Sequence, residues 1–143
     1  IPYLFLDHTS FRTREDMDYE IIKYFKRNKV EGIVMAGWMR IVTPVLINAF
    51  PDRIINIHPS LLPSFPGQCA IEDALHSGVQ ITGCTVHLVK PEVDSGPILI
   101  QSAVPVLESD NKESLTKRIQ IQEHTILPKG ISMAASNWRG VNI

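Results

Sequence analysis

The sequence predicts an α/β domain with a mostly parallel sheet that ends in an antiparallel edge hairpin. Apolar runs of strand length alternate with segments whose apolar residues recur at helical spacing, an alternation typical of α/β proteins. Only a short connection containing Pro and Gly separates the last two apolar runs, which favours a hairpin. With 143 residues, 44% of them hydrophobic, the chain is long enough to form one domain with a sizeable core.

The first half of the chain is predicted to contain three strands and two helices. Three apolar runs are expected to form the strands: residues 3–6, 32–37 and 53–57. Thr13 is a suitable N-cap for a helix with an apolar face formed by Met17, Ile21, Tyr24 and Phe25. Thr43 and Pro44 predict the start of the second helix, because proline is favoured at the first helical position.

The second half is predicted to contain two more helices and the two hairpin strands. A helix beginning near Ala70 should end at Gly78, since glycine commonly follows the last helical residue. Asp110 and Glu113 match a capping box for the final helix, and Pro128 should kink or end that helix. The hairpin strands are expected over residues 81–89 and 98–106.

Composition and charge exclude several classes of function. The net charge is −1 and the basic residues are mostly dispersed, so we expect no nucleic-acid binding. No run of about 18 apolar residues suggests a membrane span, and the first residues do not resemble a signal peptide. The two cysteines, Cys69 and Cys84, lie in different contexts and do not indicate a disulfide framework. The sequence therefore predicts a cytoplasmic protein without membrane contacts.

Two separate turns carry side chains that suit acyl transfer. Asn56 can donate a hydrogen bond to an oxyanion, and His58 can carry a proton near neutral pH. Asp94 can orient or deprotonate a nucleophile. Asn56 and His58 lie at the end of a predicted strand, where ligands bind in open α/β sheets. Each of these three residues alone also suits a structural role in a turn or cap. The prediction of acyl transfer therefore rests on all three occurring together.

The motifs around these residues resemble the folate-dependent formyltransferase family. The resemblance rests on Thr13-Arg14-Glu15, Met35 to Ile41, Asn56 to Gly67, Thr82 to His87, Val93 to Leu99 and Gln122-Glu123-His124. It implies a Rossmann-like formyltransferase fold and a cis peptide bond at Leu62-Pro63. It also implies that 10-formyltetrahydrofolate donates a formyl group to the amine of glycinamide ribonucleotide in de novo purine biosynthesis, with no metal.

The resemblance also implies roles for individual residues. Asn56 and protonated His58 would stabilise the oxyanion of a tetrahedral intermediate, and Asp94 would transfer a proton, through an ordered water. Glu123 would bind the ribonucleotide, although sequence alone favours a solvent-facing position for Glu123 and His124. Folate binding is implied for Arg14, Met39, Arg40, Ile41, Val42, Asn56, Val89, Lys90 and Asp94.

Two departures from the family pattern affect these expectations. The chain begins at the position of the family's third strand, so we expect residues 1–143 to be a partial formyltransferase catalytic domain that lacks the N-terminal phosphate-binding β-α-β region. An open sheet and poor stability in isolation would follow. In addition, Gln68-Cys69 stands where relatives carry histidine, aspartate or asparagine.

Several alternative functions remain open from the sequence. A formyltetrahydrofolate hydrolase would use the same trio with water in place of the amine, although its relatives differ over residues 64–67; methionyl-tRNA and sugar-nucleotide formyltransferases are related options. His58, His87 and Asp94 could instead form a facial metal site, but their irregular spacing argues against one. The chain could also be an inactive folate-binding fragment. The sequence does not indicate an oligomeric state.

Overall fold

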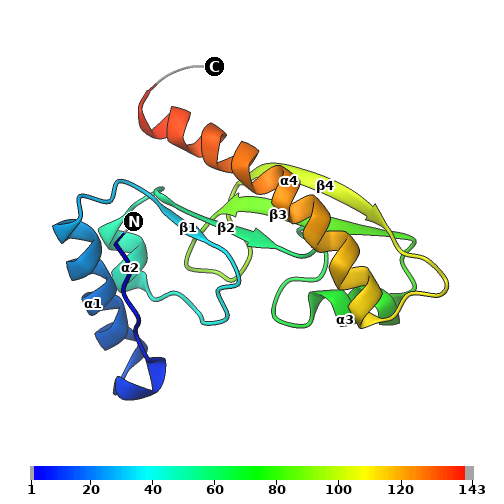
Figure 1. The fold of residues 1–143 in the computed structure, drawn as a ribbon, viewed down its shortest axis with the longest axis horizontal. Helices are drawn as coiled ribbons and strands as arrows, with labels where there is room; N and C mark the ends of the chain where they lie inside the picture. Colours follow the sequence, from blue (N-terminus) through cyan, green and yellow to red (C-terminus); the bar gives the residue numbers. More distant parts are fainter. Residues whose placement is uncertain (1, 141–143) are drawn as a thin grey trace.

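A mixed four-stranded sheet with the order β1-β2-β3-β4 forms the centre of the molecule (Figure 1). The computed structural model describes residues 2–140. The strands are β1 (Ile33–Met35), β2 (Ile54–His58), β3 (Ile81–Leu88) and β4 (Ile98–Pro105). β1 pairs with β2 in parallel, whereas β2 with β3 and β3 with β4 are antiparallel. The α/β class and the β3–β4 hairpin are thereby confirmed.

The expectation of a mostly parallel sheet is not met among the described strands, because only the β1–β2 pairing is parallel. A parallel β2–β3 pairing would need a connection that crosses back over the sheet. Instead, residues 59–80 and their helix stay near the carboxyl end of β2, so β3 returns in the opposite direction (Figure 1).

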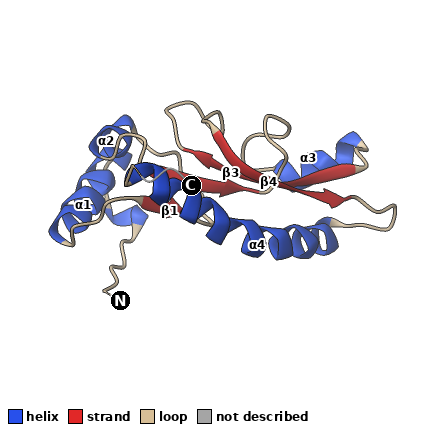
Figure 2. Cartoon of the chain, turned by 90° about the horizontal axis from the view of Figure 1, so that it is seen from above, coloured by secondary structure: helices blue, strands red, loops and turns tan. Residues whose placement is uncertain are grey.

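The described residues form four α-helices, α1 (Arg14–Arg27), α2 (Pro44–Ala49), α3 (Ala70–Ser77) and α4 (Lys112–Trp138), and a short 3₁₀ helix, η1 (His8–Ser10). α4 lies along one face and contacts β2, β3 and β4, while α1 and α2 pack together beside β1 (Figure 2). The core accordingly has two parts. One lies between α4 and the sheet and the other joins α1 and α2 to β1. No helix within residues 2–140 is long and apolar enough to cross a membrane.

Several local signals produce the structures predicted from them. Thr13 caps α1 and forms a reciprocal capping box with Asp16. Gly78 ends α3 in the left-handed conformation, and the Leu62–Pro63 peptide bond is cis. Thr43 occupies the N-cap position of α2, but its hydroxyl makes no cap hydrogen bond.

One local prediction was wrong because of tertiary structure. Residues 3–6 form no strand, and Tyr3 and Phe5 are 90% and 83% exposed. Among the described residues no strand pairs with them, and an extended segment needs such a partner. Of the two alternatives predicted for Pro128, ending the helix is excluded, because α4 continues to Trp138.

The capping box of α4 lies one residue later than predicted. Asn111 and Ser114 form it, because the carboxylate of Asp110 instead receives two hydrogen bonds from the Arg118 guanidinium. These contacts hold the pKa of Asp110 well below its usual range. A capping-box motif covers only four residues, so it cannot show that Arg118, eight residues along the chain, binds the carboxylate of the predicted cap.

Candidate functional site

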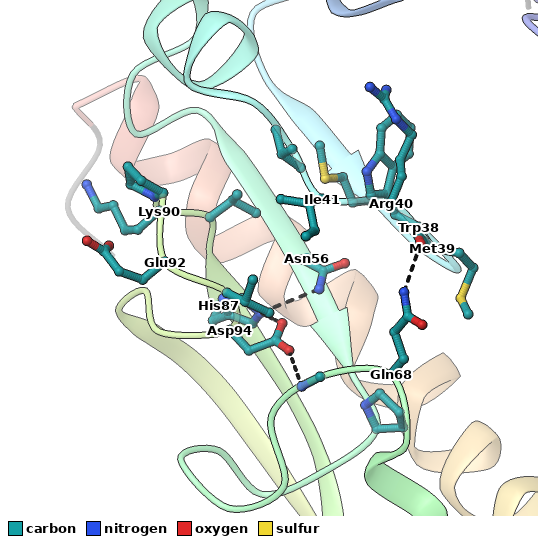
Figure 3. A pocket seen from close by; sticks show the side chains of 17 residues that line it. Trp38, Met39, Arg40, Ile41, Asn56, Gln68, His87, Lys90, Glu92 and Asp94 are labelled. Atoms are coloured by element: carbon teal, nitrogen blue, oxygen red, sulfur yellow. Dashed lines mark hydrogen bonds and ion pairs between the residues drawn. The ribbon is translucent and has the colours of Figure 1, made fainter. Parts of the chain in front are cut away.

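A cavity of about 190 Å³ opens beyond the carboxyl end of β1 and above the middle of β2 (Figure 3). Two segments form its sides. We call residues 38–42, which follow β1, the β1 wall, and residues 89–94, which follow β3, the β3 wall. Asn56 and His87 form the floor between them, and Gly67 and Gln68 close one end. Pockets that enclose an entire drug-sized ligand measure about 300–1,000 Å³, so this cavity suits one ring system of a larger ligand.

The cavity brings together most of the residues expected to bind folate. Its lining includes Met39, Arg40, Ile41, Val42, Asn56, Val89, Lys90 and Asp94. Arg14 does not line it; its side chain is exposed at the start of α1, and its carbonyl oxygen accepts a hydrogen bond from Arg40. Trp38 and His87, which the sequence analysis did not include in the folate site, are part of the lining.

Asp94 connects the two imidazoles near the floor. Its Oδ2 lies 3.4 Å from Nδ1 of His58, and its Oδ1 lies 3.7 Å from Nε2 of His87. The backbone N–H of Gly67 also donates to Oδ2, at 2.9 Å. Asp94 has a φ of +51°, a left-handed conformation that costs a non-glycine residue about 1–2 kcal/mol. The surrounding contacts maintain this carboxylate in one position facing the cavity.

His58 lies behind Asp94 and is not part of the cavity lining. Its side chain is only 7% exposed, and its Nε2 lies 2.8 Å from the carbonyl oxygen of Phe65. Both ring nitrogens therefore face oxygen acceptors, an arrangement that the doubly protonated ring satisfies. Direct donation from His58 to an oxyanion in the cavity would require Nε2 to leave the Phe65 carbonyl.

His87, and not His58, lies on the cavity floor beside Asn56. Its Nδ1 lies 2.9 Å from the carbonyl oxygen of Leu88, so Nδ1 carries the proton and Nε2 is an acceptor. Nε2 faces the Asn56 amide nitrogen at 3.5 Å. Burial lowers the pKa of His87, against the opposing effects of the Leu88 carbonyl and Asp94. A neutral His87 can thus orient the Asn56 amide and leave its second N–H free to donate.

The sequence carried only a weak signal for His87. It lies in the Thr82 to His87 motif, but apolar neighbours in a buried strand gave it no distinctive context. Its position depends on the pairing register, which sets His87 opposite Asn56. Only the tertiary structure provides that register.

The described residues give no support to the metal site considered for His58, His87 and Asp94. The three side chains are close, and one ring nitrogen of each histidine faces a backbone carbonyl, Nε2 in His58 and Nδ1 in His87. In the part of the chain that the structure describes, no group of three His, Cys, Asp or Glu side chains has a geometry suited to a metal ion.

Comparison with known proteins identifies the family. Residues 1–131 match the sequence profile of the family described as formyl transferase. The chain belongs to the formyl transferase family. Phosphoribosylglycinamide formyltransferase of Escherichia coli is 40% identical over 127 residues, which are 89% of this chain and 60% of that protein. The trifunctional purine biosynthetic protein adenosine-3 of Chironomus tentans is 42% identical over 142 residues, 99% of this chain and 10% of that protein.

Solved structures support the same assignment. The crystal structure of phosphoribosylglycinamide formyltransferase from Bacillus halodurans matches with a TM-score of 0.88 and 41% identity, over 94% of this chain and 69% of that one. The similarity confirms the Rossmann-like formyltransferase fold. This formyl transferase chain spans only a tenth of the insect protein and about 60% of the Escherichia coli enzyme.

Glu123 of this formyl transferase lies outside the cavity lining, on α4 beneath the sheet. It is half-buried rather than solvent-facing, whereas its neighbour His124 is exposed. Burial raises the pKa of Glu123, and the charges of His124 and His58 act in the opposite direction. A role for Glu123 in ribonucleotide binding stays a prediction.

Proposed function

We propose that this chain carries the folate-binding and reacting groups of an enzyme that transfers a formyl group from 10-formyltetrahydrofolate to the amine of glycinamide ribonucleotide. Such a reaction belongs to de novo purine biosynthesis, and the proposal includes a cytoplasmic location. The observation that carries it is the cavity in which an amide and a carboxylate, Asn56 and Asp94, meet between two walls. The names of the bacterial relatives support it.

The β1 wall fits a flat heterocycle with polar edges. Residues 38–42 belong to no helix or strand, and among the described residues their main-chain groups make no hydrogen bonds with other main-chain groups. Apart from the Met39 carbonyl oxygen, which the Gln68 amide contacts, these N–H and C=O groups can therefore bind the edge of a pteridine. Exposed apolar side chains at the mouth, Met39, Ile41 and Val93, can cover its faces.

The proposed reaction is direct attack of the ribonucleotide amine on the formyl carbon. A new C–N bond forms, the carbonyl oxygen becomes an oxyanion, and the bond to the folate nitrogen then breaks. The free N–H of Asn56 donates to the oxyanion. Asp94 accepts a proton from the attacking amine and returns one to the leaving nitrogen, directly or through a water. His58 contributes by pairing with Asp94, and donates to the oxyanion itself only if it leaves Phe65.

The experiment that tests this proposal measures consumption of 10-formyltetrahydrofolate with and without glycinamide ribonucleotide. It uses both the 143-residue chain and the longest product of its reading frame. Consumption that requires the amine supports formyl transfer, whereas consumption without it supports the hydrolase alternative. Asp94→Asn is the matched control, since it keeps the side-chain shape and removes the proton acceptor. Binding of the folate without turnover in any of these proteins would contradict the proposal.

A further inference from the structure

The β1 wall has an unusual support, because its shape depends on side chains rather than on secondary structure. Its main-chain groups lack main-chain partners among the described residues. The contacts that reach it come from elsewhere in the sequence. The most extensive of them come from one buried residue of α1, Asp18.

Asp18 is completely buried and accepts three hydrogen bonds from the segment that contains the wall. Its Oδ1 accepts from Nη1 of Arg40 at 2.8 Å. Its Oδ2 accepts from the backbone N–H of Thr43 at 3.1 Å and from the Thr43 hydroxyl at 2.6 Å. One carboxylate thus holds the middle of the β1 wall and the residue just after its end.

Arg40 extends this network across the wall. Its Nη2 donates to the carbonyl oxygen of Arg14 at 3.0 Å, and its guanidinium carbon lies 5.4 Å from the ring centre of Trp38. The guanidinium therefore links α1 to Trp38 and to the segment of the wall that carries Arg40 itself. Asp18 itself does not line the cavity, so it acts on the cavity only through Arg40 and Thr43.

We infer that Asp18 is a positioning residue for the formyl-folate donor, which sets the backbone conformation of the β1 wall from behind the cavity. The inference rests on the proposed function. An uncompensated buried carboxylate would be costly, so three donors are needed to keep it there. Because one donor belongs to Arg40 in the wall and the other two belong to Thr43 directly after it, satisfying the charge of Asp18 restrains both the middle and the end of the wall.

The main test is Asp18→Asn, which keeps the side-chain shape and removes the charge. The KM for 10-formyltetrahydrofolate should rise about tenfold or more, as expected for the loss of charge-assisted hydrogen bonds. The KM for glycinamide ribonucleotide and kcat should change much less. Asp16→Asn is the matched control: it makes the same change two residues away on α1, at an exposed position that contacts only the cap.

A second measurement does not depend on the reaction. Amide hydrogen exchange at Thr43, whose N–H donates to Asp18, should be faster in Asp18→Asn than in the wild type, and unchanged in Asp16→Asn. Equal exchange rates in the wild type and Asp18→Asn overturn the inference, as does a kinetic loss that falls equally on both substrates. If the wild-type protein transfers no formyl group, the proposed function fails, whereas hydrogen exchange still decides whether Asp18 holds the wall.

Thr43 provides a second pair of variants in case Asp18→Asn does not fold. Thr43→Val removes the hydroxyl that donates to Asp18 and keeps the side-chain volume, whereas Thr43→Ser retains the hydroxyl. We expect a rise of about threefold in the donor KM for the valine variant and recovery in the serine variant. Identical donor KM values for the two variants would overturn the inference, because a purely steric role would not distinguish them by their hydroxyl.

Discussion

The two walls of the cavity are built in different ways. The β3 wall is anchored to the sheet at its start: Val89, its first residue, donates its backbone N–H to Ile54, and Leu88 just before it donates to Pro97, both at 2.9 Å. The β1 wall lacks such main-chain bonds among the described residues and depends on the carboxylate of Asp18. The first arrangement needs a formed sheet to anchor the start of the wall. The second needs particular side chains that lie far apart in sequence.

The difference determines which substitutions should disrupt the conformation of each wall. A wall held by main-chain hydrogen bonds is sensitive to any group that separates the strands, whatever its chemistry. A wall held by side chains should lose its shape while the sheet stays intact. Disruption of the β3 wall should therefore appear mainly as a lower free energy of unfolding. Disruption of the β1 wall should appear mainly as weaker binding of the formyl donor.

The largest functional effect is expected at the floor that both walls share. Asn56→Ala should lower turnover by about 10²–10³-fold, the typical cost of losing one oxyanion donor. Steady-state kinetics with both substrates measures the loss, and thermal unfolding shows whether the fold is retained. Turnover near that of the wild type would exclude Asn56 as the oxyanion donor.

The largest effect on stability is expected at Gly96, at the base of the β3 wall. A Cβ at this position would overlap the carbonyl oxygen of Leu88, which is a backbone atom and cannot move freely. Gly96→Ala should therefore lower the free energy of unfolding by about 3 kcal/mol. Urea denaturation provides the measurement.

Gly37, just before the β1 wall, is the matched control. It has a φ of +64°, but a Cβ there would have no atom of the described chain within 4 Å. Gly37→Ala should cost only the backbone strain, about 1 kcal/mol. Equal losses in the two alanine variants would show that the walls do not differ in the way described.

A smaller effect, dependent on pH, is expected from His87 on the floor. Burial lowers its pKa below the value of 6.5 that applies to an exposed histidine. Below about pH 6.5 the unfolded chain therefore binds a proton that the folded chain excludes, and the free energy of unfolding falls as the pH decreases. His87→Gln should reduce this fall between pH 7.5 and pH 5.5, as measured by urea denaturation. Identical pH profiles for wild type and variant would show that His87 is not held neutral.

The smallest effect is expected at the contact between the end of the cavity and the β1 wall. The Gln68 amide nitrogen lies 3.4 Å from the carbonyl oxygen of Met39, and Gln68 is exposed (Figure 3). Gln68→Ala should raise the KM for the formyl donor by about twofold, because an exposed neutral hydrogen bond contributes little. An effect larger than that of Asp18→Asn would mean that this contact, and not Asp18, controls the wall.

Local elements were predictable where a short motif contains its own physical cause. Thr13 and Asp16 satisfy each other within one turn, and Gly78 ends α3 by its own backbone conformation. The strand predicted for residues 3–6 was wrong because no described strand pairs with it, and the capping box predicted at Asp110 was wrong because Arg118, eight residues along the chain, binds that carboxylate. The direction of β3 was also missed, since hydrophobic periodicity carries no information on whether neighbouring strands run parallel.

For this protein, the sequence by itself determined the family, the order of most helices and strands, and the residue types that gather at the cavity. Each of these depends on neighbours along the chain or on motifs that are contiguous in sequence. Only the tertiary structure decided that His87 faces Asn56, that His58 lies behind Asp94, and that Asp18 supports the β1 wall. Strand register and buried charge pairing bring these groups together across dozens of residues, and no local pattern encodes such distances.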